Sequence, residues 1–144
     1  MGRKGRIMAI DGMLAMCGLT LEEASTFLGE PPRRLRRWRA RDSNPPLSTL
    51  DKLSALYKRQ VEAADVIVEA WFKAGAPDEI TIEMPSTDEE AQARGWPCLR
   101  TVDVVAMHVQ LEISPARLKI IAPAEHAEIE ETAPEADDAS EAAA

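Results

Sequence analysis

Aromatic residues, histidine and cysteine are scarce in this chain of 144 residues. Phe, Trp and Tyr make up 4% of it, and there are two His and two Cys. Cys17 and Cys98 lie far apart in apolar contexts, and neither His108 nor His126 has a Cys, Asp or second His at the spacing of metal ligands. The sequence therefore predicts no metal site and no cofactor. It also predicts reduced cysteines in the core, as in cytoplasmic proteins.

Long apolar runs are also lacking. The longest are far shorter than the roughly 20 residues that a membrane-spanning helix needs, and residues 7–10 are too short for the apolar part of a signal peptide. No Gly-rich phosphate loop follows a predicted strand, and no nucleophile stands near a base and an orienting group. We therefore expect a cytoplasmic protein that is not an enzyme and does not enter a membrane.

The charge is divided unevenly along the chain, whose formal net charge is −8. Residues 1–60 hold 12 Lys and Arg against 6 Asp and Glu, residues 61–121 hold 5 against 11, and residues 122–144 hold none against 8. A basic first part before an acidic remainder is typical of an anion-binding module with other segments attached. Residues 122–144 carry too little apolar surface to offset their ordering entropy, which predicts a disordered acidic tail.

The beginning of the basic part predicts two short helices. The first spans about residues 7–17, and Gly18 ends it. Thr20 is a good N-cap for the second helix, and Glu23, three residues later, completes a capping box. Gly29 ends this second helix. The end of the first helix and both ends of the second therefore carry residues that favour a helix boundary there.

A third short helix and one long helix follow. Pro31 and Pro32 open the third helix, because proline is tolerated in a first turn, and this helix runs to about residue 39. Residues 42–46 predict a turn. Ser48 then caps a helix whose apolar positions continue to about Lys73, either unbroken or with a bend.

Residues 61–121 give mixed signals after the long helix. Residues 80–84 alternate between apolar and polar side chains and predict a strand. Ser86 and Glu89 form a capping box for a short helix. Residues 99–113 fit a helix and a strand equally well, and residues 118–121 suggest a last strand. The fold class is therefore mainly α, with a small α+β part.

The spacing inside residues 20–46 is typical of a helix-turn-helix. Ala24 is small enough to let two helices cross closely, and Gly29 tolerates a positive φ in the turn between them. Leu35 and Trp38 are three residues apart and can both face the protein interior. The segment therefore has the parts that a DNA-reading motif needs.

Six arginines fall within nine residues, at positions 33–41. Like charges three or four residues apart repel by a few tenths of a kcal/mol per pair, and phosphate contacts with counterion release would compensate. Arginine also pairs with guanine O6 and N7. We expect base contacts from Arg33 and from Arg36 or Arg37, and phosphate contacts from the others. The full set of expected DNA-binding residues is Thr20, Pro32, Arg33, Arg34, Arg36, Arg37, Arg39, Arg41 and Asn44. The alternative is a solvated basic face or one that docks an acidic partner.

The segment TLEEASTFLGEPPRRLRRWRARDSNPPLSTLDKL, which starts at residue 20, resembles the helix-turn-helix of the lambda-repressor and Cro-like superfamily. The matching positions are Thr20, Ala24, Gly29, Leu35, Trp38 and Pro46. The sequence departs from the pattern at Leu21, where the family often has glutamine. It departs again at residues 39–41, where Glu-x-Gly often follows the tryptophan, so the resemblance does not set the geometry of this loop.

A narrower resemblance covers most of residues 7–121. The layout is similar to that of the anti-CRISPR-associated repressors, the second class in particular, with a long helix after the motif, a strand near Ile80, and Gly95-Trp96 before an apolar segment. The resemblance implies a helix-turn-helix domain at residues 1–60, a C-terminal dimerisation domain at 61–121, and repression of the protein's own operon in a phage or other mobile element. It favours a helix over residues 99–113.

A dimer is expected because repressors of this fold read two half-sites about one DNA turn, roughly 34 Å, apart, and because buried aromatic residues often anchor interfaces. The expected dimer residues are Val68, Trp71, Phe72, Trp96, Val105 and Val109, with plain core packing as the alternative.

The sequence thus predicts a homodimeric, sequence-specific transcriptional repressor that binds an inverted repeat in double-stranded DNA. RNA binding is an alternative, since arginine-rich helices also enter structured RNA. An antitoxin-type interaction module is another.

Overall fold

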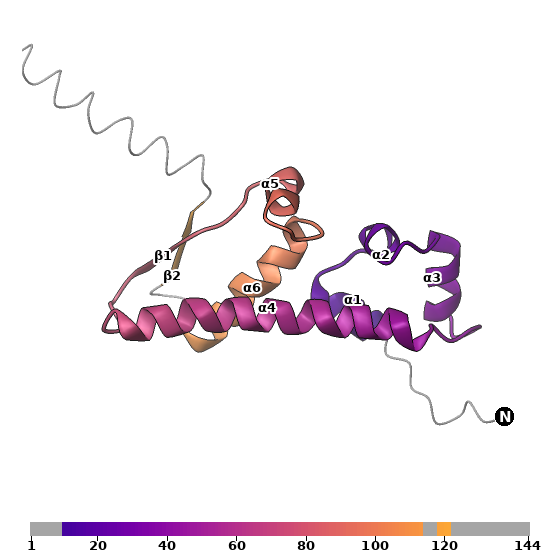
Figure 1. The fold of residues 1–144 in the computed structure, drawn as a ribbon, viewed down its shortest axis with the longest axis horizontal. Coiled ribbons are helices and arrows are strands. Elements are labelled where there is room, and N and C mark those ends of the chain that lie inside the picture. Colours follow the sequence, from indigo (N-terminus) through magenta and orange to yellow (C-terminus); the bar gives the residue numbers. More distant parts are fainter. Residues whose placement is uncertain (1–9, 114–117, 122–144) are drawn as a thin grey trace, which may run out of the picture.

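The computed structural model describes residues 10–113 and 118–121, and within them the protein is mainly helical. Figure 1 shows one long helix, α4, running along the whole molecule. The elements are α1 (Ile10–Cys17), α2 (Leu21–Leu28), α3 (Pro32–Arg39), α4 (Leu47–Lys73), β1 (Ile80–Glu83), α5 (Asp88–Ala93), α6 (Leu99–Glu112) and β2 (Leu118–Ile121). The expected start of the first helix at residues 7–9 and the expected disordered tail at residues 122–144 lie outside the described residues.

α1, α2 and α3 surround one end of α4, and β1, α5, α6 and β2 lie along the rest of it (Figure 1). β1 and β2 pair in parallel, with Ile80 opposite Leu118 and Glu83 opposite Ile121. The described chain therefore has two groups of elements that share a single helix. None of its helices has both the length and the apolar character that crossing a membrane demands.

The buried side chains fall into two clusters that match these two groups. The first joins α1, α2, α3 and the first half of α4, and consists of Ile10, Leu14, Cys17, Leu19, Ala24, Leu28, Leu35, Trp38, Leu53, Leu56 and Cys98. The second joins the remainder of α4 to β1, α5 and α6, and consists of Ala64, Ile82, Met84, Ala91, Val102, Val105, Ala106, Val109 and Ile113. Trp96 packs against both clusters, so the two are continuous.

The structure confirms one uncertain helix from the sequence analysis and corrects the cap residues of two others. The segment over residues 99–113 is the helix α6, as the resemblance favours. The expectation that Ser48 caps the long helix is wrong, because α4 begins after the extended residue Pro46 and uses no side-chain cap. The expected capping box of Ser86 and Glu89 is also wrong, because the cap of α5 lies one residue later. Thr87 is the N-cap of α5, and it accepts a hydrogen bond from the backbone N–H of Glu90 at 3.1 Å.

Both cysteines are free and buried. Burial raises the pKa of the Cys17 thiol to about 11, so it stays protonated at neutral pH. Burial also raises the pKa of Cys98. Within the described residues no group of three His, Cys, Asp or Glu side chains could hold a metal ion.

The buried amide of Gln60 ties three helices together at the centre of the molecule. Its Nε2 donates to the backbone carbonyl of Cys17 at the end of α1, at 2.8 Å, and to that of Thr101 in α6, at 2.9 Å. Nearby, the guanidinium of Arg59 lies 4.0 Å from the centre of the Trp96 ring and donates to the carbonyl of Gly95 at 2.6 Å. α4 is therefore joined to the elements of both clusters by hydrogen bonds and a cation–π contact as well as by apolar packing.

Replacing Gln60 by Leu should lower the free energy of unfolding by about 1–3 kcal/mol, because the carbonyl of Cys17 then lies in the core without its donor. Urea denaturation measures the change. Gln92→Leu is the control, because Gln92 is exposed and, among the residues that the structure describes, its amide bonds only to the carbonyl of Pro97. Equal, small effects of the two substitutions would contradict the bridging role of Gln60.

Candidate nucleic-acid interface

The capping box predicted at the start of α2 is present. The hydroxyl of Thr20 accepts from the backbone N–H of Glu23 at 3.1 Å, and the Glu23 carboxylate accepts from the backbone N–H of Thr20 at 2.9 Å. Burial alone would raise the pKa of Glu23, but hydrogen bonds from Thr20 and Cys98 and the nearby charge of Arg100 together lower it. Glu23 is therefore ionised at neutral pH, and the start of α2 is fixed.

A tight turn joins α2 to α3. Gly29 has a φ of +68°, and a Cβ there would meet no atom within 4 Å, so only the backbone conformation requires glycine. The backbone N–H of Glu30 donates to the carbonyl of Ser25, and the Ser25 hydroxyl donates back to the carbonyl of Glu30. Pro32 then occupies the first position of α3, where its missing N–H is not needed.

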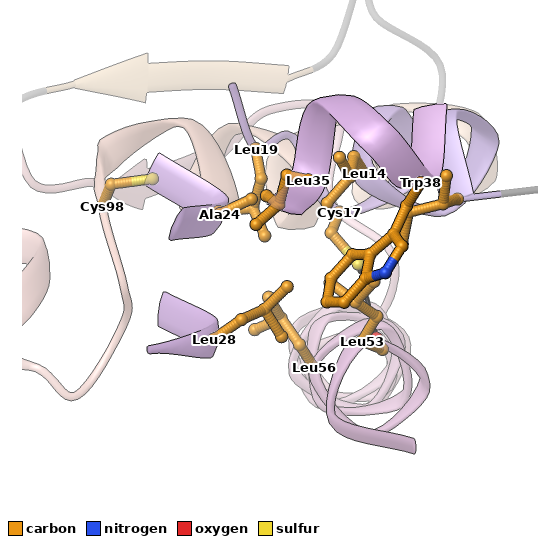
Figure 2. Packing of buried hydrophobic residues seen from close by; sticks show 11 residues of the cluster. Leu14, Cys17, Leu19, Ala24, Leu28, Leu35, Trp38, Leu53, Leu56 and Cys98 are labelled. Carbon is orange, nitrogen blue, oxygen red and sulfur yellow. Dashed lines mark hydrogen bonds between the residues drawn. The ribbon is translucent and has the colours of Figure 1, made fainter. Parts of the chain in front are cut away.

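The rotation of α3 about its axis is set by two buried side chains. Leu35 is 0% exposed and Trp38 is 3% exposed. Figure 2 shows both pointing into the first cluster, Leu35 near Ala24 and Trp38 near Leu53. Apart from Pro32 and these two residues, all positions of α3 are exposed arginines. In Figure 1 this helix stands across the direction of α4 at one end of the described chain.

Two of the six arginines have carboxylate partners on the protein. Arg34 contacts Glu30 at 2.7 Å, one turn earlier, and Arg39 contacts Asp11 of α1. Within the described ranges, the guanidinium groups of the other four form no ion pair. Three of these four, Arg33, Arg36 and Arg37, share one face of α3 by their spacing. We call these three residues the arginine ridge.

Arg41 has an unusual backbone conformation just beyond α3. Its φ is +63°, in the left-handed region that favours glycine. Its N–H donates to the carbonyl of Trp38 at 3.1 Å, and the N–H of Asp42 donates to that of Arg37 at 3.0 Å, which together make a Schellman motif. The loop after Trp38 therefore keeps a glycine-type turn, although the glycine often found in the resembled pattern is an arginine here.

A groove of about 610 Å³ opens between α3 and the loop that follows it. Its lining residues are Pro31, Arg33, Arg34, Arg37, Trp38, Ser43, Asn44 and Pro46. Three guanidinium groups, the Asn44 amide and the Ser43 hydroxyl can all donate hydrogen bonds there, and no carboxylate lines it. The groove therefore suits ligands that present anionic oxygen atoms.

The structure brings Arg33, Arg34, Arg37 and Asn44 together in this groove, and Pro32 stands beside it at the start of α3. Thr20, at the start of α2, does not line the groove, and its hydroxyl serves as the helix cap. Sequence reasoning missed Ser43. The only available signal was its position beside Asn44 in the turn, because the return of that loop towards α3 is a tertiary feature.

The expected dimer residues separate into three groups by their burial. Val105 and Val109 are buried in the second cluster, so the expectation that they contact a second copy is corrected: they are core residues of the chain itself. Trp71, Val68 and Trp96 are half-buried against that same cluster, and the Trp71 indole donates to the Pro77 carbonyl at 3.0 Å. Phe72 alone among the six residues Val68, Trp71, Phe72, Trp96, Val105 and Val109 is largely exposed.

A scan against protein-family models finds no match for this chain, and a search of curated proteins finds none either. The features that bear on function are the geometry of α3, that of its neighbouring loop and the charges around them.

Replacing Arg41 by Gly should raise the free energy of unfolding by about 1 kcal/mol, because glycine adopts a positive φ without the steric cost that an L side chain bears. Urea denaturation with an unchanged slope measures the gain. Arg41→Ala is the matched control, since it removes the same charge but keeps the strained Cβ. Equal stabilisation by the two variants would show that charge repulsion, and not backbone strain, is relieved.

Proposed function

We propose that this protein is a sequence-specific DNA-binding transcriptional repressor that acts as a homodimer on an inverted repeat. The single observation that carries the proposal is the orientation of α3. Burial of Leu35 and Trp38 leaves the arginine ridge exposed on the opposite side, without carboxylate partners in the described part of the chain. A helix of this width fits the major groove of B-form DNA, where arginine pairs with guanine.

The position of Arg33 supports the proposal on energetic grounds. It lies in the first turn of α3, where the helix dipole disfavours a positive charge by about 0.3–1 kcal/mol. Arg34 lies in the same turn, but Glu30 is there to offset it. Arg33 has no such offset among the described residues, whereas the first turn of a recognition helix is where side chains reach base edges. A hydrogen-bonded contact between Arg33 and guanine would offset the unfavourable interaction of its charge with the helix dipole.

The groove beside α3 supports a role in holding the DNA backbone. Phosphate contacts fix the register of a protein on the duplex and account for most of the salt dependence of binding. Arg34 and Asn44 line the groove, and Arg39 is held at the other end of α3 by Asp11. When DNA binds, these side chains give up their contacts with carboxylates or water and contact phosphate oxygens instead. Autoregulation of an operon in a mobile element completes the proposal, on the strength of the resemblance to the anti-CRISPR-associated repressors.

Selection of bound duplexes from a random pool tests the proposal. The expected product is a palindrome with half-sites about one helical turn apart. A pool of structured RNA stem-loops is selected in parallel. Enrichment of stem-loops with no enriched duplex would favour the RNA alternative, and enrichment of neither would reject nucleic-acid binding by the arginine ridge.

Single substitutions should then separate base contacts from phosphate contacts. Arg33→Ala or Arg36→Ala should cost about 1–3 kcal/mol on the selected duplex and relax its sequence preference, whereas Arg39→Ala should weaken selected and random duplexes alike. Each phosphate contact that is removed should also lower the salt slope by about 1. Titrations at several salt concentrations measure both effects.

Arg94→Ala is the control for these titrations, because Arg94 is an exposed arginine just after α5 that faces Glu83 of β1 at 3.9 Å. It should leave affinity and salt slope unchanged. Equal losses on selected and random DNA for every arginine would contradict the assignment of Arg33 and Arg36 to bases.

A further inference from the structure

The arginines of α3 can hold carboxylate oxygens as well as phosphate oxygens. Within the described chain, Arg34 already contacts the carboxylate of Glu30 at 2.7 Å. Arg39 contacts the carboxylate of Asp11 in the same way. The arginine ridge forms no ion pair among the described residues, and no carboxylate lines the groove beside it. Because carboxylates and phosphates both accept charge-assisted hydrogen bonds from guanidinium groups, a carboxylate-rich segment fits this surface chemically.

Residues 122–144 are such a segment by composition. They contain eight Asp and Glu, no Lys and no Arg. Four of the acids precede Pro134, and we call them the near carboxylates: Glu125, Glu128, Glu130 and Glu131. The other four follow Pro134, and we call them the far carboxylates: Glu135, Asp137, Asp138 and Glu141. The two sets have equal charge but lie at different distances along the chain from β2.

The charge of the rest of the chain favours α3 as the partner of this segment. Residues 61–121, which lead into it, hold 5 Lys and Arg against 11 Asp and Glu, so they repel it. Residues 1–60 hold 12 against 6, and six of those cations are the arginines at positions 33–41. Because exposed charges are screened beyond about 10 Å at 0.1 M salt, the attraction is strongest where carboxylates contact these arginines directly.

The segment is also long enough to reach α3 from the end of β2. α3 lies at one end of α4, and β2, which ends at Ile121, lies along the rest of it (Figure 1). α4 has 27 residues and is therefore about 40 Å long. An extended chain that starts at Ile121 spans at most about 36 Å by residue 131, and about 50–70 Å by residues 135–141. The far carboxylates therefore have a reach that exceeds the whole length of α4.

A tethered segment competes with DNA at a high local concentration. Tethers of this kind give an effective concentration on the order of 1 mM, which does not depend on how dilute the protein is. Single exposed ion pairs are weak, so the contact is reversible and leaves a fraction of the molecules with a free ridge. The apparent dissociation constant for DNA rises in inverse proportion to that fraction.

We propose that the far carboxylates occupy the arginine ridge and its groove in the DNA-free protein, and that residues 122–144 thereby compete with DNA from within the same molecule. The inference rests on the proposed function, because it concerns the regulation of that same surface. Every duplex must displace the same segment. The competition therefore weakens selected and random DNA by the same factor and leaves the sequence preference unchanged.

Nuclear magnetic resonance of the DNA-free protein tests the contact itself. The Nε–H signals of Arg33, Arg36 and Arg37 are compared between the full chain and a shortened chain that ends at Ile121. They should differ at about 50 mM salt, and the difference should vanish as salt rises to about 500 mM. The signal of Arg94 is the control and should not change.

Two results of this comparison would overturn the proposal. One is a set of ridge signals that is identical in the full and shortened chains at low salt. The other is a difference that grows with protein concentration, because it would place the segment of another copy on the ridge. Urea denaturation of both chains checks that the fold is intact.

Two charge-matched variants separate direct contact from general repulsion between DNA and an acidic chain. The far variant carries Glu135→Gln, Asp137→Asn, Asp138→Asn and Glu141→Gln. The near variant carries Glu125→Gln, Glu128→Gln, Glu130→Gln and Glu131→Gln. Each variant removes four negative charges and keeps the length of the chain.

The far variant should bind the selected duplex at least about threefold more tightly than the wild type at low salt. The near variant should show less than about half of that gain, because its far carboxylates still reach the ridge. Random duplexes should show the same ratios. Equal gains for the two variants would indicate long-range repulsion and would overturn the proposal.

These measurements also separate this proposal from the proposed function. If the ridge signals respond to the segment and neither the full nor the shortened chain binds a duplex, the contact is supported and the DNA-binding proposal is rejected. If the full chain, the shortened chain and both variants bind a selected duplex equally, the DNA-binding proposal stands and competition by residues 122–144 is rejected.

Discussion

The burial of Leu35 and Trp38 is the constraint on which the rest of the structure depends. Each buried side chain of this size contributes at least about 1.5–3 kcal/mol relative to an exposed one, and both belong to the same eight-residue helix. Rotating α3 about its axis would expose them and force guanidinium groups into the core, at several kcal/mol for each unpaired charge. The orientation of the arginine ridge is thus a consequence of apolar packing and does not need a nucleic acid to establish it.

The same packing divides the molecule into two ends with different chemistry. α4 runs from the cluster that holds α3 to the cluster that holds α6 (Figure 1). Near the middle of α4, Gln60 donates hydrogen bonds to the end of α1 and to α6. One end therefore presents cationic side chains on a fixed helix, and the other is built around the second buried cluster.

Local chemistry made the first part of the chain predictable from its sequence. The capping box at Thr20 and the positive φ at Gly29 are decided by residues within a few positions of each other, and both are present. Ser48 failed as a cap because the extended Pro46 starts α4 two residues earlier. Val105 and Val109 were assigned to an interface because apolar periodicity identifies a buried face but not what covers it. The groove beside α3 depends on how the loop after this helix folds back onto it. A second hollow joins Gly18 to α6, which lie far apart in the sequence. No local sequence pattern reveals either of them.

Nuclear magnetic resonance of the side chains of α3, during titration with a selected duplex, shows whether the arginine ridge reads DNA while Leu35 stays buried. We expect the Nε–H signals of Arg33, Arg36 and Arg37 to shift and saturate with added duplex, while the methyl groups of Leu35 remain in their buried environment in the free and the bound states. Ridge signals that ignore the duplex, or Leu35 methyl groups that are exposed to solvent in the free protein, would contradict it.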